Sequence, residues 1–168
     1  MRGHAMSLRV DFREAEEAGR WHAVNDGVMG GVSQGGLHVE EGLGVFAGRL
    51  SLDHGGGFAS VRRERGDPAL DEAHGMRLRV RGDGRTYQLR LRADRLPEGA
   101  AYRARFATSG DWQTLDLPWS DFEAVYRGRR LDDAPPLAPE EIRQLGFLIA
   151  DRREGDFRLE IATLEALA

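Results

Sequence analysis

The fold class is decided by a stretch in the middle of the chain, Met76-Arg77-Leu78-Arg79-Val80-Arg81-Gly82-Asp83-Gly84-Arg85-Thr86-Tyr87-Gln88-Leu89-Arg90-Leu91-Arg92. Apolar and polar side chains alternate on both sides of the Gly-Asp-Gly turn, and a period of two is typical of β-strands with one buried face. An Asp-Gly pair between two such runs is a strong hairpin signal. We therefore predict an antiparallel hairpin over residues 76–92.

The same alternation continues outward from this stretch and predicts further strands. They are expected at residues 8–12, 37–39, 43–52, 58–62, 102–106, 113–117, 145–150 and 157–161. About ten short strands at this spacing are typical of a sandwich or barrel. Helix is scarce, with one or two turns expected over residues 13–18 and a short helix beginning at Pro139, where acidic residues follow. The predicted fold is all-β, a sandwich of about ten antiparallel strands with one or two short helices.

The length and composition are those of an ordinary globular domain. The chain has 168 residues, of which 40% are hydrophobic and 31% charged, so it can bury a core of its own. No fixed repeat and no linker divides it, and we expect a single β-sandwich domain over residues 8–168. Residues 1–7 show no pattern and are expected to form a flexible leader.

Charge and cysteine content exclude several classes of protein. The chain contains no cysteine, which rules out disulfides, thiolate metal sites and a cysteine nucleophile. A net charge of −4 gives no overall field that would attract nucleic acid. No apolar stretch approaches the ~20 residues of a membrane helix, and the N-terminus lacks the apolar core of a secretion signal. We therefore expect a cytoplasmic protein with no membrane insertion and no nucleic-acid partner.

Recognisable catalytic motifs are missing from the sequence. The five histidines are scattered, and neither a G-x-S-x-G elbow, a Walker A loop nor a complete G-x-G-x-x-G is present. No spacing of aspartates demonstrates a calcium site. The sequence therefore predicts no catalytic residue, no cofactor and no metal ligand, and a hydrolase is the least favoured of the functions considered.

Several motifs in a fixed order carry a family resemblance. In chain order they are residues 21–33 (WHAVNDGVMGGVS), 46–51, 55–62 (GGGFASVR), 81–87, 112–122, 127–129, 145–147 and 155–157. Over nearly the whole chain, from about Leu8 to Leu164, the sequence resembles the complex I intermediate-associated protein family of the thirty-kilodalton type. The resemblance implies a galactose-binding-domain-like β-sandwich, or jelly roll. It also implies a chaperone-like role in assembling respiratory NADH:ubiquinone oxidoreductase.

The motif at residues 21–33 is the first candidate surface for binding a partner. Trp21 and Met29 would supply apolar contacts, and Asn25 and Asp26 polar ones. The alternative is a structural loop, because Asn and Asp beside glycine commonly cap turns by bonding to the backbone. Both interpretations remain open from the sequence.

Arginines form the second candidate surface. If the strands at 76–81, 87–92 and 102–106 share one sheet, seven arginines emerge on the same face: Arg77, Arg79, Arg81, Arg90, Arg92, Arg103 and Arg105. Guanidinium groups bind carboxylates and other anions bidentately, so the face could engage an acidic protein segment or an anionic ligand. The alternative is a solvated face paired internally with Asp and Glu. We include Arg62, which ends the motif at 55–62, among the candidate partner-binding residues.

Two functions follow from these surfaces. The first is a non-catalytic protein-binding module, chaperone or assembly-factor-like, whose partners include subunits of a respiratory complex. The second is a carbohydrate or small-ligand binding module that uses the concave face of the sandwich.

Overall fold

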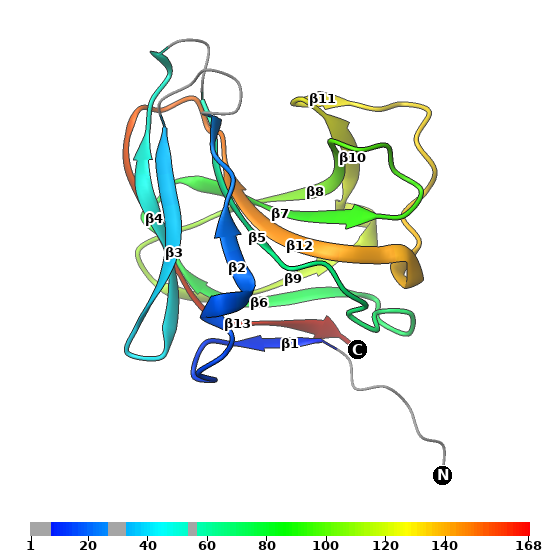
Figure 1. The fold of residues 1–168 in the computed structure, drawn as a ribbon, viewed down its shortest axis with the longest axis horizontal. Helices are drawn as coiled ribbons and strands as arrows, with labels where there is room; N and C mark the ends of the chain where they lie inside the picture. Colours follow the sequence, from blue (N-terminus) through cyan, green and yellow to red (C-terminus); the bar gives the residue numbers. More distant parts are fainter. Residues whose placement is uncertain (1–7, 27–32, 54–56) are drawn as a thin grey trace.

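Two antiparallel sheets make up the computed structural model, which describes residues 8–26, 33–53 and 57–168 (Figure 1). Sheet A contains β1 (Arg9–Asp11), β3 (Gln34–Glu40), β4 (Leu43–Leu50), β6 (Gly75–Arg81), β9 (Trp112–Pro118) and β13 (Gly155–Leu167). Sheet B contains β2 (Trp21–Ala23), β5 (Ala59–Arg63), β7 (Thr86–Ala93), β8 (Ala100–Ala107), β10 (Glu123–Tyr126), β11 (Arg129–Arg130) and β12 (Ile142–Ile149). This architecture confirms the predicted all-β sandwich.

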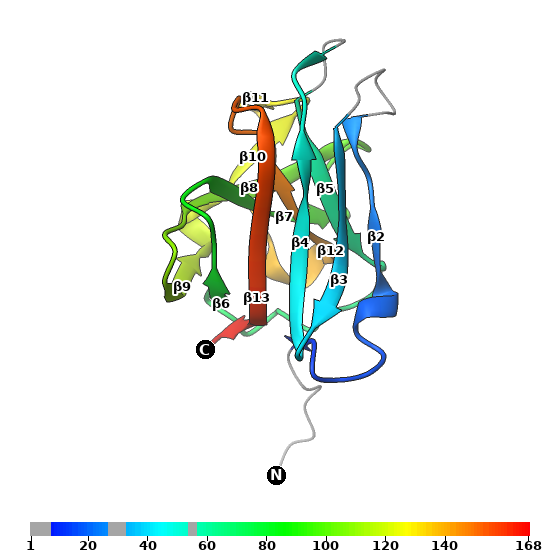
Figure 2. The same ribbon diagram turned by 90° about the vertical axis from the view of Figure 1, so that its left-hand side faces the viewer.

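The order of strands in each sheet mixes distant parts of the chain. Sheet A runs β3-β4-β13-β6-β9, with β1 also pairing with β13, and Figure 2 shows β3, β4 and β13 side by side. Sheet B runs β11-β10-β8-β7-β12-β5-β2. In Figure 1 β7, β8 and β12 of sheet B lie above β6, β9 and β13 of sheet A, and β10 and β11 stand up at one edge of sheet B. The outer face of sheet B is therefore bordered on that side by its own strands.

Helical structure among the described residues is limited to short 3-10 turns. They are η1 (Ala18–Arg20), η4 (Trp119–Asp121) and η5 (Pro139–Glu141). The last begins at Pro139, as predicted, because proline's fixed φ suits a first helical position. No helix in the described part of the chain has the length and apolar character needed to cross a bilayer. The expected leader at residues 1–7 lies outside the described residues.

The core lies between the sheets and is filled by the inward-facing residue of each alternating pair. Leu78 of β6 and Leu89 of β7 are fully buried, and Phe106 of β8 is 5% exposed. Aromatic rings meet at the centre, where Phe46 and Phe157 pack edge to face at 4.9 Å between ring centroids. The period-two pattern therefore predicted correctly which side chains face the core.

The predicted hairpin over residues 76–92 is wrong. β6 pairs with β13 and β9 in sheet A, whereas β7 pairs with β12 and β8 in sheet B, so residues 82–85 cross from one sheet to the other. Gly84 has the left-handed φ of +89° that the turn requires, and a Cβ on Gly82 would lie 2.1 Å from Oγ1 of Thr108. Alternation gives the buried face of each strand and not the sheet to which it belongs.

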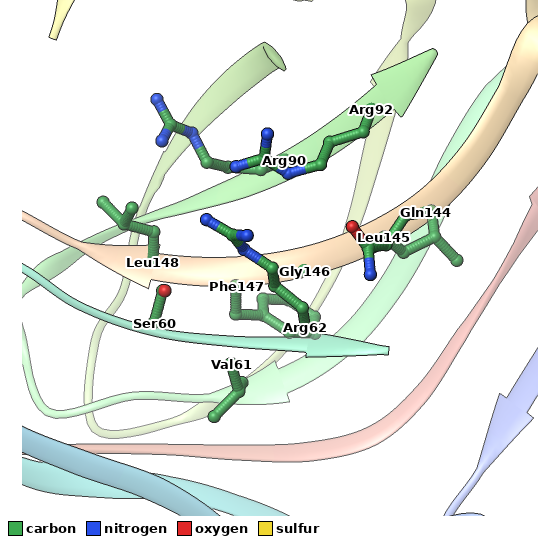
Figure 3. A pocket seen from close by; sticks show the side chains of 10 residues that line it. All are labelled: Ser60, Val61, Arg62, Arg90, Arg92, Gln144, Leu145, Gly146, Phe147 and Leu148. Atoms are coloured by element: carbon green, nitrogen blue, oxygen red, sulfur yellow. The ribbon is translucent and has the colours of Figure 1, made fainter. Parts of the chain in front are cut away.

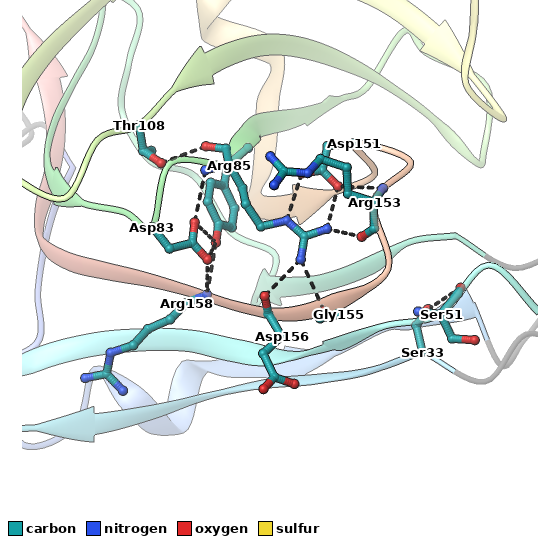
Figure 4. Close-up of polar contacts among 11 residues, drawn as sticks. Ser33, Ser51, Asp83, Arg85, Thr108, Asp151, Arg153, Gly155, Asp156 and Arg158 are labelled. Atoms are coloured by element: carbon teal, nitrogen blue, oxygen red, sulfur yellow. Dashed lines mark hydrogen bonds and ion pairs between the residues drawn. The ribbon is translucent and has the colours of Figure 1, made fainter.

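A buried arginine holds this crossover in place (Figure 4). Nε and Nη2 of Arg85 donate to the two carboxylate oxygens of Asp151 at 2.8 and 2.6 Å, and Nη1 donates to the carbonyl of Asp156 at 2.9 Å. The backbone carbonyl of Arg85 accepts a 2.7 Å bond from Oγ1 of Thr108. The side chain of Arg85 is only 6% exposed, so the crossover between sheets is tied to the loop between β12 and β13 by a buried ion pair.

Asp83 completes the same junction from the turn itself. Its carboxylate accepts hydrogen bonds from the hydroxyl of Tyr87 at 3.0 Å and from the backbone N–H of Arg158 at 2.8 Å. Burial and the nearby Asp83 carboxylate raise the pKa of Tyr87 well above its usual range, so the phenol stays protonated and donates. The motif at residues 81–87 thus stabilises the crossover between the two sheets.

Replacing the buried cation tests this junction. Arg85→Met is expected to lower the free energy of unfolding by about 3–5 kcal/mol, because Asp151 and several carbonyls would remain buried without their donor. Guanidinium chloride denaturation measures the change. Arg49→Met on β4, where the side chain is 66% exposed, is the control and should stay within about 0.5 kcal/mol of wild type. A loss below about 1 kcal/mol for Arg85→Met would contradict the assigned role.

Candidate partner-binding site

One row of residues crosses the outer face of sheet B from β5 to β10. The strand register pairs Arg62 with Gly146, Gly146 with Arg90, Arg90 with Arg103, and Arg103 with Glu123. Their chain neighbours, such as Val61 and Leu89, point into the core. Because side chains alternate along a strand, the row itself faces outward.

Two neighbouring rows extend this surface. On one side Ser60, Leu148, Gln88 and Arg105 are aligned, and on the other Gln144 lies opposite Arg92. We call the five arginines on the outer side of sheet B the arginine face: Arg62, Arg90, Arg92, Arg103 and Arg105. All five were among the residues predicted to bind a partner.

Gly146 leaves a hollow in the middle of this face (Figure 3). Arg62 and Arg90 stand on the strands to either side of it, about 10 Å apart at their Cα atoms, since adjacent strands are about 4.8 Å apart. A Cβ at position 146 would lie 2.6 Å from the carbonyl oxygen of Val61, so the local packing requires glycine. Figure 3 shows the guanidinium groups of Arg62, Arg90 and Arg92 on the same side of the sheet, around the β12 backbone.

Negative charge does not balance the arginine face. Glu123 pairs with Arg103 at 2.9 Å, and no other carboxylate of the described residues forms an ion pair with this face. Arg92 donates from Nη1 to the backbone carbonyl of Ala100 at 3.3 Å, which supplies an acceptor and no compensating charge. The alternative interpretation, an arginine face paired internally with carboxylates, therefore holds for Arg103. It does not hold for Arg62, Arg90 or Arg92.

The pKa shifts reflect this uncompensated charge. Burial, together with repulsion from the neighbouring Arg92, Arg103 and Arg62, lowers the pKa of Arg90 to about 10. Burial and the charges of Arg62 and Arg65 likewise lower the pKa of Arg92 to about 10, and burial lowers that of Arg62. These guanidinium groups remain charged at neutral pH, but they are held where charge is costly.

Two polar atoms of the same face are buried without a hydrogen-bond partner. They are Nε of Arg90, a donor, and Oε1 of Gln88, an acceptor. A buried polar atom left unpaired costs about 1–3 kcal/mol, so native structures seldom keep one without a reason. A bound molecule that carries both acceptors and donors would satisfy them.

Arg77, Arg79 and Arg81 do not belong to this surface, and the prediction that all seven arginines share one face is wrong. They lie on β6, in the opposite sheet, because residues 82–85 cross between the sheets. Arg81 pairs with Glu160 at 2.6 Å and Arg77 with Asp116 at 2.6 Å. The guanidinium carbons of Arg79 and Arg81 lie 5.5 and 5.3 Å from the ring centroid of Trp112.

Trp21 of the predicted binding motif belongs to the core. It is 9% exposed, and its ring stacks on that of Phe147 at 5.9 Å between centroids. Its Nε1 donates to the buried carboxylate of Glu17 at 2.9 Å, which is also bonded by Arg63. The side chain has little surface left for a partner. Met29 lies outside the described residues.

Asp26 is fully buried, and its carboxylate binds the backbone of two other segments of the chain. Its carboxylate accepts hydrogen bonds from the N–H groups of Ser33 at 2.9 Å, Gly57 at 2.7 Å and Phe58 at 3.3 Å. Burial opposes its ionisation, but the bonds from Ser33, Gly57 and Phe58 outweigh burial and lower its pKa. These contacts support the structural interpretation of Asp26.

Asn25, the residue before Asp26, also forms hydrogen bonds to the backbone of other segments. Its Nδ2 donates to the carbonyl of Gly35 at 3.1 Å, and its Oδ1 accepts from the N–H of Ser60 at 3.2 Å. The side chain thus connects β3 of sheet A to β5 of sheet B. Both polar residues of the motif are engaged within the fold, as turn-capping Asn and Asp commonly are.

Elsewhere on the described surface, the acidic side chains do not form a metal site or an isolated catalytic pair. No group of three or more His, Asp or Glu side chains there could hold a metal ion. A hollow of about 300 Å³ between β10 and residues 131–137 contains Glu123 and Asp132, and both carboxylates are ion-paired, with Arg103 and Arg130. These carboxylates are placed as partners of arginine and not as an isolated acid and base pair.

Some residues of the site were not predicted from the sequence. Gly146 lies in the hollow and Gln88 carries one of the unpaired buried atoms of the face, but neither was predicted as a binding residue. Gly146 did carry a signal, because a glycine inside a strand often marks a close approach of backbone or ligand. Gln88 carried none, since its partner strands were unknown.

The two antiparallel sheets form a β-sandwich with the fold seen in carbohydrate-binding modules. The family 11 carbohydrate-binding module from Clostridium thermocellum, solved with a β-1,3-1,4-mixed-linked tetrasaccharide, is similar with a TM-score of 0.69 and 14% identity, covering 98% of both chains. A family 29 module, CBM29-2, has a TM-score of 0.55 and 12% identity, covering 96% of this chain and 92% of that one. At such identities the likeness shows the fold alone.

The chain belongs to the Complex I intermediate-associated protein 30 (CIA30) family, whose sequence model matches residues 10–161. Complex I intermediate-associated protein 30, mitochondrial, of Mus musculus is 29% identical over 172 residues, covering 89% of this chain. The protein of the same name in Drosophila melanogaster is 26% identical over 175 residues, covering 90% of this chain. The chain spans 52% and 59% of the lengths of these two relatives. The family resemblance found in the motifs is thereby confirmed.

The expectation of a cytoplasmic protein is contradicted by these relatives, which are named as mitochondrial. The expectation rested on the lack of an apolar segment at the N-terminus. Such a segment marks secretion, whereas mitochondrial targeting sequences are amphipathic and rich in arginine, so its absence could not decide the compartment.

Replacing Arg90 tests whether its unpaired charge lowers the stability of the fold. Arg90→Met keeps the length of the side chain and removes a buried, unpaired charge, so we expect the free energy of unfolding to stay unchanged or to rise by about 1–2 kcal/mol. Chemical denaturation at neutral pH measures this. A fall of more than about 2 kcal/mol would mean that Arg90 stabilises the fold and is not reserved for a ligand.

Asp26 is expected to act through stability. Asp26→Ala should lower the free energy of unfolding by about 3 kcal/mol, because three backbone N–H groups lose their acceptor. Since its pKa is lower in the folded than in the unfolded chain, this contribution is present at neutral pH and lost as pH falls through the folded-state pKa. The stability difference between wild type and Asp26→Asn should therefore shrink on acidification. Wild-type stability in Asp26→Ala, with partner binding lost, would make the loop a contact surface instead.

Proposed function

We propose that this chain is a non-catalytic protein-binding module, assembly-factor-like, that acts in the assembly of respiratory complex I. Membership of the family whose members are named for complex I intermediates supports the process. The observation that carries the binding role is the arginine face, where Arg62, Arg90 and Arg92 lack carboxylate partners among the described residues. Guanidinium groups in that state are suited to bind an acidic surface of another protein.

Assembly requires binding that can be reversed, and the chemistry of this face suits that requirement. Partly exposed guanidinium groups attract an acidic partner over long range and raise its rate of association. Because the gain is electrostatic and partly screened by salt, it speeds encounter without making the complex permanent. The neighbouring Leu148, 7% exposed, offers only a small apolar contact.

A carbohydrate-binding module is the second candidate, favoured by the fold. Neutral sugars are commonly bound by stacking on aromatic rings and by polar side chains in a concave site. Among the residues that line the hollow of sheet B the one aromatic is Phe147, and its side chain is 1% exposed and lies in the core. The residues at this position therefore support binding of an anionic protein surface more strongly than of a neutral sugar.

Co-purification from the native source tests the function. Tagged wild-type protein is expected to enrich subunits of NADH:ubiquinone oxidoreductase, identified by mass spectrometry. The double variant Arg62→Met with Arg90→Met should recover them about tenfold less, since losing charged interface groups weakens binding by about 2 kcal/mol or more. Arg49→Met with Arg130→Met removes the same charge elsewhere and should behave as wild type.

Two outcomes would overturn the proposal. The first is recovery of no respiratory-complex subunit by the wild type. The second is equal recovery by the double variant, which would place binding elsewhere on the protein. Binding of neutral glycans on an array, together with the first outcome, would favour the carbohydrate module.

A further inference from the structure

The arginine face has a regular spacing of charge along the strand direction. Arg90 and Arg92 are two residues apart on β7 and point to the same side. An extended strand rises about 3.3–3.4 Å per residue, so their Cα atoms are about 7 Å apart. Arg62 lies across β12 from Arg90, with no side chain at Gly146 between them. The cations therefore flank a track that follows β12.

The unpaired atoms of this face specify the chemistry of an occupant. Nε of Arg90 is a buried donor without an acceptor, and Oε1 of Gln88, in the neighbouring row on β7, is a buried acceptor without a donor. A carboxylate only accepts and fits the guanidinium fork, and a peptide N–H can donate to the amide oxygen. A polypeptide with acidic side chains supplies both groups at once.

The spacing also specifies the conformation of that polypeptide. In an extended segment, side chains two residues apart lie on one face with the same repeat of about 7 Å as the strand beneath. In a helix, residues two apart do not face the same way. An extended segment therefore places carboxylates at alternate positions over Arg90 and Arg92 together, whereas a helix would need carboxylates three or four residues apart.

Glu123 limits where the segment can lie. It neutralises Arg103 at 2.9 Å and presents negative charge at the β10 side of the face. An acidic chain would be repelled there and attracted toward β12, where Arg62, Arg90 and Arg92 have no counterion among the described residues. The arrangement thus favours one track over the rest of the sheet.

We propose that the arginine face binds an extended protein segment with Asp or Glu at alternate positions, lying along β12 between Arg62 and Arg90. This inference rests on the proposed function in taking the partner to be a protein. It adds the sequence pattern and conformation of the segment that is bound.

Isothermal titration calorimetry with two synthetic peptides tests the pattern. Both contain the same number of glutamates and serines, so their net charges are equal. Glutamate and serine alternate in one peptide, and in the other Glu-Glu pairs alternate with Ser-Ser pairs, so that no two of its glutamates are two residues apart. At low ionic strength the alternating peptide is expected to bind about tenfold tighter, the effect of one additional charge-assisted contact. Equal affinities would overturn the proposal, because binding would then depend on net charge alone.

Variants locate the contact. Arg90→Met should weaken binding of the alternating peptide about tenfold, while Arg49→Met on β4 of sheet A should change it less than about twofold. The unfolding midpoint of each variant establishes that it is folded. Undiminished binding by a folded Arg90→Met protein would overturn the proposal. So would tighter binding of an oligosaccharide of uronic acids than of the alternating peptide, which would make the ligand an anionic carbohydrate.

The peptide and co-purification experiments distinguish failure of the proposed binding pattern from failure of the proposed function. If respiratory subunits are recovered in an Arg62- and Arg90-dependent way but the two peptides bind equally, the proposed pattern fails and the proposed function stands. If the alternating peptide is preferred but no respiratory subunit is recovered, the binding site stands and the role in complex I assembly fails.

Discussion

Uncompensated positive charge above the backbone of β12 is the constraint on which the functional interpretation depends. The strand register brings Arg62, Arg90 and Arg103 into one row around Gly146, and Glu123 is the one carboxylate of the described residues that pairs with this row. Repulsion and desolvation act against the folded state at this place. A fold that keeps such a cluster gives up stability locally, which is typical of sites that bind a ligand. The core and the Arg85 junction, which lie elsewhere in the sandwich, offset this local loss of stability.

The buried arginine at the crossover and the arginines of sheet B illustrate two uses of one side chain. Arg85 has a carboxylate and several carbonyls as partners, so it ties the two sheets together. Arg90 has neither kind of partner among the described residues, although its guanidinium group, like that of Arg85, is withdrawn from solvent. The difference lies in the surroundings and not in the residue type. Counting arginines therefore says little about function until their partners are known.

Alternation along the chain was enough to predict the all-β class and the buried members of each strand, such as Leu78, Leu89 and Phe106. It could not predict that β6 and β7 lie in different sheets, because a crossover and a hairpin begin with the same turn residues. That single ambiguity misplaced Arg77, Arg79 and Arg81. The roles of Asp26 and Gly146 depend on backbone from distant strands, which no local pattern contains. The family, in contrast, was predicted correctly because its motifs span the chain in order.

Arg62, Arg90 and Arg92 are expected to bind anions together. NMR spectra of the arginine Nε–H groups, recorded while the alternating acidic peptide is added, test it most directly because each guanidinium reports separately. We predict that the resonances of these three residues shift together and saturate, while those of Arg85 and of Arg79 on the opposite sheet stay in place. Saturating shifts at Arg79 and Arg81, with none at Arg90, would contradict the account.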